Sequence, residues 1–288
     1  MAKEREVYLM KVQVITMPDS LGDRMKTYEN VTRTYLTRRT PVIIRLDGCH
    51  FHSFTRGFDK PYDEILCASM QETMQYLCEH IQNCVLGYTQ SDEITLVLCD
   101  YKKLTTSAWF DDNIQKMASV SASMATMKFN TAFTQNIDEY GKSNIPDWEY
   151  GGTNQTLSDE ETKALELVSS YDKAISSGAI FDSRVFNIPK EEVCNCLIWR
   201  QQDATRNSIQ GLGQKHFSHK QLENKSCDQI QDMLMTEKNI NWNDTPTKFK
   251  RGSCCIKTEN GWKIDNEIPI FTQDRDYVEK RLVFDENE

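Results

Sequence analysis

Two short acidic motifs are the residues of this chain best suited to chemistry. The first is Arg-Leu-Asp-Gly at residues 45–48, and the second is Ser-Asp-Glu at residues 91–93. Two carboxylates set close together can hold a pair of Mg²⁺ ions about 3.5–4 Å apart, an arrangement that supports phosphoryl and nucleotidyl transfer. The alternative is that the first motif is an ordinary turn and the second a solvated hairpin tip. The pair favours the metal interpretation, because both acids directly abut apolar runs.

The elements that must position these acids are predicted by the apolar runs around them. Strand-like runs precede both motifs, at residues 42–44 and 85–88, and a third run at residues 94–98 follows the second motif. The second motif is therefore predicted to connect a β-hairpin. A helix-like stretch, roughly residues 62–81, separates the two motifs. This order can bring Asp47 and Asp92 to neighbouring strand ends.

Length and composition indicate a globular protein. The chain has 288 residues, 39% of them hydrophobic and 27% charged, which is room for one large domain or two small ones. No apolar run approaches the roughly 18–20 residues that cross a bilayer, and Lys11 interrupts the short apolar stretch near the N-terminus. Ten cysteines occur without a Cys-x-x-Cys pair, and several lie inside apolar patterns. We therefore expect no membrane partner, no secretory signal, and a reduced cytoplasmic protein with buried thiols.

The charge pattern leaves open a polyanionic partner. A net charge of −9 argues mildly against nucleic acid, but basic residues concentrate in three segments. An ordinary solvated surface is the alternative to polyanion binding for each of them. The segments contain Arg24, Lys26, Arg33, Arg38, Arg39 and Arg45; then Arg200, Arg206, Lys215, His216, His219 and Lys220; then Lys248, Lys250, Arg251 and Lys257.

The remaining elements complete an α+β pattern. A helix is predicted at residues 112–135, with one apolar face formed by Ile114, Met117, Val120, Met124 and Met127. The segment from residue 141 to 155 is predicted to be a loop, and Ser158 with Glu161 predicts a capping box that starts a helix to about residue 176. The other predictions are a polar helix or arm at 21–29, a strand at 181–186, a helix from about residue 190, a basic loop at 203–225, a helix at 228–237, and a hairpin from 252–256 and 262–264.

This order favours a polymerase-palm-like fold. It fits a ferredoxin-like β-α-β-β-α-β antiparallel sheet with flanking helices and a C-terminal helical and hairpin extension, rather than a doubly wound sheet. We expect a catalytic palm-like region at residues 1–190, with an N-terminal arm and an insertion at 141–178. Residues 191–288 are expected to form a C-terminal substrate-binding region integrated with the palm.

Five ordered motifs show a family resemblance. The chain resembles the tRNA-histidine guanylyltransferase family, and more closely its branch of guanylyltransferase-like 3′-to-5′ polymerases, over roughly residues 20–135 and 180–257. The motifs are Arg45-Leu46-Asp47-Gly48-x-x-Phe51-His52-x-Phe54, Lys60-Pro61-x-Asp63, Tyr88-x-Gln90-Ser91-Asp92-Glu93, Phe181-Asp182-x-Arg184-Val185 and Trp199-Arg200-Gln201-x-Asp203.

The resemblance implies an enzyme that activates the 5′-end of tRNA with ATP, GTP or another nucleoside triphosphate. It then adds a nucleotide through attack by the incoming 3′-hydroxyl. Asp47 and Asp92 would be catalytic, and with the Gly48 carbonyl they would hold two Mg²⁺ ions. The triphosphate would contact Asp47, Gly48, Cys49, His50, Phe51, His52, Lys60, Ser91 and Asp92. The expected tRNA contacts are Arg200, Arg206, Asn207, Lys215, His219 and Lys220. We expect Glu93 to be solvated rather than a third acidic ligand, and the family's usual assembly suggests a homotetramer.

One departure from the family pattern bears on the substrate. Enzymes specific for tRNA-His follow the Trp-Arg-Gln-x-Asp motif with a segment rich in His and Asn, whereas residues 203–210 here contain no histidine. This favours template-dependent repair of 5′-truncated tRNA over addition of the −1 guanosine to tRNA-His. A palm-type nucleotide cyclase is a more distant alternative, which would leave the basic segments after Arg200 without a role. A non-catalytic tRNA-binding protein is disfavoured because Asp47, Lys60, Ser91 and Asp92 are all present.

Overall fold

The computed structural model describes residues 20–146, 148 and 157–284, and the chain divides into two compact units, residues 1–34 and 35–288. In the first unit the described residues form α1 (Leu21–Asn30). Ser20 caps this helix by accepting a hydrogen bond from the backbone N–H of Asp23, and none of the helix's side chains is buried. The helix predicted at residues 21–29 is thus confirmed.

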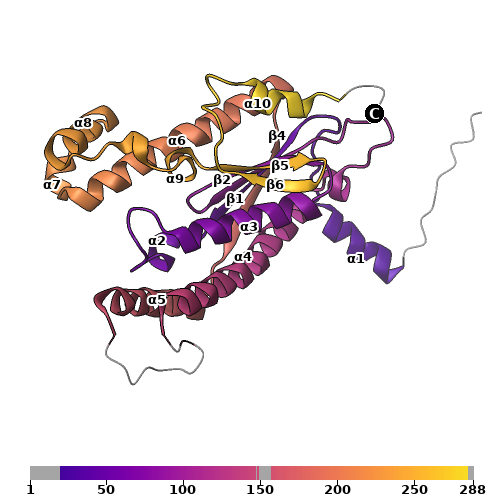
Figure 1. The fold of residues 1–288 in the computed structure, drawn as a ribbon. Helices are drawn as coiled ribbons and strands as arrows, with labels where there is room; N and C mark the ends of the chain where they lie inside the picture. The colour runs from indigo at the N-terminus through magenta and orange to yellow at the C-terminus, as the bar shows by residue number, and fades with distance from the viewer. Residues whose placement is uncertain (1–19, 147, 149–156, 285–288) are drawn as a thin grey trace, which may run out of the picture. The chain divides into compact units, whose positions relative to one another are not determined.

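The described part of the second unit is built on one six-stranded antiparallel sheet in the order β4-β1-β3-β2-β5-β6 (Figure 1). The strands are β1 (Val42–Gly48), β2 (Cys84–Gln90), β3 (Glu93–Leu98), β4 (Phe181–Asn187), β5 (Ser253–Thr258) and β6 (Gly261–Asp265). The α-helices are α2 (Phe51–Phe54), α3 (Glu64–His80), α4 (Ile114–Asn144), α5 (Asp159–Ser177), α6 (Lys190–His216), α7 (His219–Leu222), α8 (Cys227–Lys238), α9 (Thr247–Arg251) and α10 (Asp276–Glu279), and the 3₁₀ helices are η1 (Trp109–Asp112), η3 (Trp242–Asp244) and η4 (Lys280–Leu282).

Strands β1 to β4 with α3 and α4 form the predicted β-α-β-β-α-β palm-like core. Side chains alternate between the two faces of each strand, so one sheet carries two apolar faces. On one face Ile44 and Leu46 pack in the core cluster that also contains Met74 of α3 and Phe129 of α4. On the other face Ile43 packs in a second cluster with residues of α6 and α10 (Figure 1). The C-terminal region thereby joins the palm, because β5 pairs with β2 and α6 covers the second face.

Helix α4 is longer than predicted, and its buried stripe is different. It runs through residue 144, so the first part of the segment predicted to be a loop is helical, while residues 149–156 lie outside the described part of the chain. Met117 is buried as predicted, but Met127 is 56% exposed. The buried stripe continues instead through Ala125 and Phe129, where large aromatic contacts decide the rotation of the helix. The capping box of Ser158 and Glu161 on α5 is confirmed.

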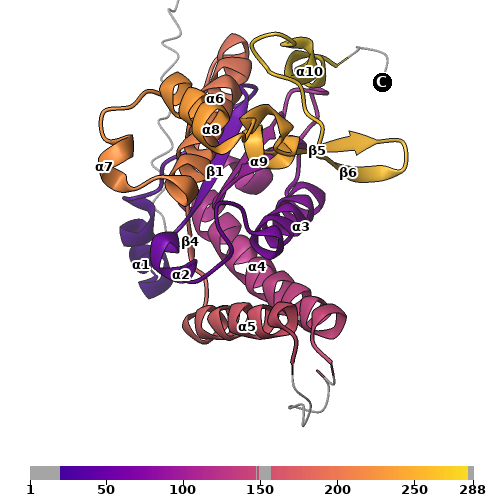
Figure 2. The same cartoon turned by 60° about the vertical axis from the view of Figure 1, so that its left-hand side comes forward.

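The prediction of a basic loop at residues 203–225 is wrong for most of the segment, because residues 203–216 belong to α6 and residues 219–222 form α7. Helix α6 continues to His216 because apolar or small residues recur at helical spacing along one side. These include Leu197, Ala204 and Leu212, all buried, and the distal part of α6 packs against α8 (Figure 2). The polar composition of the segment reflects its exposed face. Helix α8 and the β5–β6 hairpin agree with the predictions.

The cysteines and the hydropathy of the helices complete the description of the fold. All ten cysteines are free, and five of them are buried. Among the described residues no helix is both long and apolar enough to span a bilayer.

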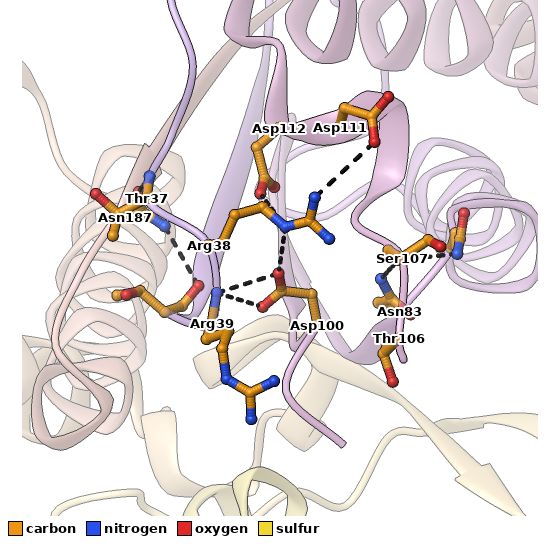
Figure 3. Close-up of polar contacts among 12 residues, drawn as sticks. Thr37, Arg38, Arg39, Asn83, Asp100, Thr106, Ser107, Asp111, Asp112 and Asn187 are labelled. Atoms are coloured by element: carbon orange, nitrogen blue, oxygen red, sulfur yellow. Dashed lines mark hydrogen bonds and ion pairs between the residues drawn. The ribbon is translucent and has the colours of Figure 1, made fainter. Parts of the chain in front are cut away.

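A polar cluster fixes the end of the sheet opposite the acidic motifs (Figure 3). The Nε atom of Arg38 lies 3.5 Å from Asp100 and 3.6 Å from Asp112, and both carboxylates are buried. The backbone N–H of Arg39 donates to both oxygens of Asp100, at 2.9 and 3.1 Å. Burial raises the pKa of Asp112 to about 6, the charge of Asp100 adds to the shift, and Arg38 opposes it. This cluster anchors the segment that leads into β1.

Candidate active site

The two acidic motifs meet where β1 ends. Asp47 lies opposite Glu93 in the β1–β3 register, and the backbone N–H of Gly48 donates to the Asp92 carbonyl at 3.1 Å. Burial raises the pKa of Asp92, and the negative charge of Asp47 raises it further, against hydrogen bonds from its own backbone N–H and Ser91. Asp47 and Asp92 are thus brought to neighbouring strand ends, as the order of elements predicts.

A buried aromatic ring fixes the turn after β1. The side chain of Phe51 packs against Phe129 and Phe181, with ring centroids 5.6 and 5.2 Å away. A Cβ atom at Gly48 would lie 2.3 Å from the Phe51 ring, so only glycine fits there. With Phe51 turned inward, the side chains of His50 and His52 remain exposed beside the acids.

The second motif forms a tight turn between β2 and β3. Ser91 has a positive φ of 51° and is exposed, and Asp92 is partly buried. The Thr89 hydroxyl donates to the Glu93 carbonyl at 2.8 Å, which closes the turn on itself. The hydroxyl of Ser91 therefore stands at the surface directly beside the Asp92 carboxylate.

The expectation that Glu93 is solvated is wrong. Glu93 is only 6% exposed, and its Oε1 accepts a hydrogen bond from the Nε of Arg200 at 2.7 Å. The Nη2 of Arg200 donates to Asp203 at 2.8 Å. Burial raises the pKa of Glu93, and Arg200 opposes the shift. Glu93 and Arg200 each belong to one of the sequence motifs, but nothing in the sequence showed that α6 would meet β3 at this point.

Arg200 consequently cannot serve as an exposed tRNA contact. Its side chain is 8% exposed and already occupied by two carboxylates. Its neighbour Trp199 is 51% exposed, with the guanidinium of Arg200 at 4.2 Å and that of Arg45 at 5.4 Å from its ring centroid. This contact of Trp199 with two arginines lies on the face of the sheet that carries Asp47. The sequence did not predict it, because Arg45 belongs to β1 and the other two residues to α6.

A cavity of about 160 Å³ opens beside the acidic turn. Ser91 and Gln90 line one side, and Asn207 and Ser208 of α6 line another. Tyr62 forms part of the wall, stacked on Phe249 with the centroids 4.9 Å apart, and its hydroxyl lies 2.8 Å from that of Ser208. The other lining residues are Pro61, Asp63, Leu66, Cys67, Met70, Thr89, Ala204, Lys248, Gly252 and Ser253. The exposed Lys60 immediately precedes this wall.

The other residues predicted to contact tRNA lie on α6 and α7 rather than in the acidic motifs. Exposed positions on α6 and α7 carry Arg206, Asn207, Lys215, His219 and Lys220. Of these, Asn207 also lines the cavity, and Arg206 pairs with Asp203. The structure brings Ser91 of the acidic turn and Asn207 to one cavity, which Lys215, His219 and Lys220 do not line. These three residues belong to the C-terminal end of α6 and to α7 (Figure 2).

The donor set suits a hard cation. Among the described residues no three His, Cys, Asp or Glu side chains group as a metal site, so the candidate site consists of two carboxylates and the Gly48 carbonyl. In the described part of the chain neither Asp47 nor Asp92 forms an ion pair, and the negative charge of Asp47 raises the pKa of Asp92. A bound cation would relieve this repulsion. Mg²⁺ commonly binds through one or two carboxylates while keeping several waters and substrate phosphates. The residues present fit that pattern.

Comparisons with known proteins identify the family. A family model described as tRNAHis guanylyltransferase (Thg1) matches residues 22–189, which is more than half of the chain. The chain belongs to the tRNAHis guanylyltransferase family. The predicted resemblance is confirmed, and the chain is a tRNA guanylyltransferase-like nucleotidyltransferase.

Relatives of this family member cover most of its length. A bacterial tRNA(His) guanylyltransferase (Thg1)-like protein solved in complex with ATP is 44% identical, with a TM-score of 0.76 over 92% of this chain and 100% of that one. A structure of such a bacterial protein with GTP is 40% identical, with a TM-score of 0.71 and the same coverage. An uncharacterised protein of Acanthamoeba polyphaga mimivirus is 29% identical over 285 residues, which is 92% of this chain and 89% of the viral protein.

We predict that Arg200→Met destabilises the fold by about 3–5 kcal/mol, because it leaves the buried Glu93 charge without its partner. Urea unfolding measures the change. The double variant Glu93→Leu/Arg200→Met should recover part of the loss, since it leaves no unpaired charge.

Arg206→Met is the matched control. Arg206 also pairs with Asp203, but it is exposed, so its loss should cost less than about 1 kcal/mol. Equal effects of the two single substitutions would contradict the assignment of a buried pair.

Proposed function

We propose that this family member is a template-dependent 3′-to-5′ nucleotidyltransferase that repairs 5′-truncated tRNA. The observation that carries the proposal is the meeting of Asp47 and Asp92 beside a cavity lined by Ser91 and Asn207. The enzyme would activate the tRNA 5′-end with a nucleoside triphosphate and then extend it.

The acids and the turn after β1 would form the catalytic centre. Asp47, Asp92 and the Gly48 carbonyl would hold two Mg²⁺ ions, which when bound would polarise the phosphates and stabilise the attacking and leaving oxygens. The Ser91 hydroxyl is placed to donate to a phosphate oxygen, and the exposed Lys60 would neutralise triphosphate charge. Backbone N–H groups of His50, Phe51 and His52 would face the same phosphates. The N–H of Cys49 cannot join them, because it already donates to the Ile180 carbonyl at 2.8 Å.

The tRNA would lie along α6 and α7. Helix α6 has 27 residues, so it is about 40 Å long. Its exposed Arg206, Asn207 and Lys215, with His219 and Lys220 of α7, offer donors to a phosphate backbone. Arg200 is excluded from this set by its burial. By analogy with the family we also propose a cytoplasmic homotetramer that uses ATP and GTP.

The segment that departs from the family pattern lies at the cavity. Asn207 and Ser208 both line it, so this part of α6 can influence which nucleotide or RNA end is accepted. Its lack of histidine supports repair with Watson–Crick selection of the nucleotide. The alternative is addition of the −1 guanosine to tRNA-His, which the name of the family favours.

We predict that Asp47→Ala and Asp92→Ala each abolish both activation and nucleotide addition, because each removes a ligand of the proposed metal pair. Single-turnover rates with labelled nucleotide measure both steps. A variant that kept more than about a tenth of the wild-type rate, a loss of only ~1.4 kcal/mol, would contradict the assignment. Glu259→Ala, at an exposed position after β5, is the control that should leave both rates unchanged.

Substrate choice tests the repair role. The comparison offers full-length tRNA-His and a tRNA of another identity that lacks its first 5′ nucleotide, each with all four nucleoside triphosphates. We expect faster, template-matched addition to the truncated tRNA, because base pairing with the acceptor strand supplies the selectivity. Faster untemplated guanosine addition to tRNA-His would establish the alternative.

A further inference from the structure

A second cavity, of about 410 Å³, lies next to the turn that follows β1. Cys49 and His50 form its rim, and they are two and three residues beyond Asp47. Three residues span at most about 11 Å, so the cavity borders the catalytic turn. Its remaining walls come from α2 and from the C-terminal half of α5, a helix to which the sequence assigned no function.

The lining of this cavity is basic and hydroxyl-rich. Arg56, Lys173 and His50 contribute the nitrogen donors, and Ser53, Ser170 and Ser177 contribute the hydroxyls. No acidic residue lines it, although the chain as a whole carries a net charge of −9. In the described part of the chain, neither Arg56 nor Lys173 forms an ion pair. These cations are therefore available to an anion.

The walls are held together by close packing. A Cβ atom at Gly57, which has a φ of +87°, would lie 2.7 Å from the Ser170 hydroxyl, so the loop after α2 approaches α5 closely. The ring of Phe58 packs edge-on against Tyr171 at 4.8 Å. Arg56 and Lys173 are thereby presented from two elements whose separation is fixed by buried neighbours, which lowers the entropic cost of ordering them around a ligand.

The dipole of α5 opposes an anion at this end, because the cavity lies toward the helix C-terminus. That effect is about 0.3–1 kcal/mol and falls off within the last turn. This unfavourable dipole effect is opposed by the full positive charges of Arg56 and Lys173. Moreover, the N–H of Gly178 already bonds to the carbonyls of Ala174 and Ile175, which reduces the exposed partial charge. The balance favours anion binding.

We propose that this cavity is a phosphate-binding subsite that holds phosphate groups of the substrate beside the catalytic turn. The inference rests on the proposed nucleotidyltransferase function and gives α5 a role in it. Phosphates can come from the RNA backbone or from a nucleoside triphosphate, and the two share the same recognition by guanidinium, ammonium and hydroxyl donors.

The test is the double variant Arg56→Gln/Lys173→Gln. Its matched control is Lys163→Gln/Lys263→Gln, which removes two exposed positive charges from the far end of α5 and from β6. Affinity for a 5′-truncated tRNA transcript is measured between about 0.05 and 0.2 M salt, and affinity for GTP is measured by calorimetry. Melting curves of both variants confirm that the fold is retained, as expected for exposed side chains.

Loss of two phosphate contacts should reduce the slope of log affinity against log salt by about 1.4–1.8, relative to the control, if the phosphates belong to RNA. A weaker GTP affinity with an unchanged RNA slope would support the subsite and assign it to the nucleotide. If wild type binds both ligands and the variant matches its control in both arms, the subsite is overturned while the proposed function stands. A wild type that binds neither ligand would instead overturn the proposed function.

Discussion

The antiparallel pairing of β1 with β3 is the constraint on which the site depends. This register sets Asp47 opposite Glu93 and lets the N–H of Gly48 reach the carbonyl of Asp92. A slip of one residue would turn Ile44 and Leu46 out of the core and remove Asp47 from its face. The large apolar cluster that buries these residues against α3 and α4 therefore also fixes the geometry of the candidate site.

Helix α6 connects this register to the proposed substrate site. Through Arg200 it neutralises Glu93, so that a third negative charge next to Asp47 and Asp92 does not stand unpaired. About two turns later, Asn207 and Ser208 reach the first cavity. The same helix thus neutralises Glu93 next to the acids and forms one wall of the first cavity. The basic cavity also borders the turn after β1, so two cavities of different chemistry lie near the acids.

The sequence predicted the parts of this arrangement that are local. Apolar runs placed the strands, the Ser158–Glu161 pair placed the start of α5, and the acidic motifs marked the strand ends. It could not predict features that depend on partners distant in the chain. Glu93 is buried only because Arg200 meets it from 107 residues away. The sequence of α6 beyond Asp203 resembled a loop because half of that helix faces solvent. The cavities could not be predicted because each combines residues from several elements.

The central claim is that Asp47 and Asp92 jointly hold a pair of divalent cations. Electron paramagnetic resonance of Mn²⁺, a spectroscopic substitute for Mg²⁺, can count the ions bound per chain in the presence of a non-hydrolysable GTP analogue. The account predicts two bound ions in the wild-type protein, with spin coupling between them, and loss of that coupling in Asp92→Asn. Uncoupled ions in the wild type, or coupling that survives the substitution, would contradict it.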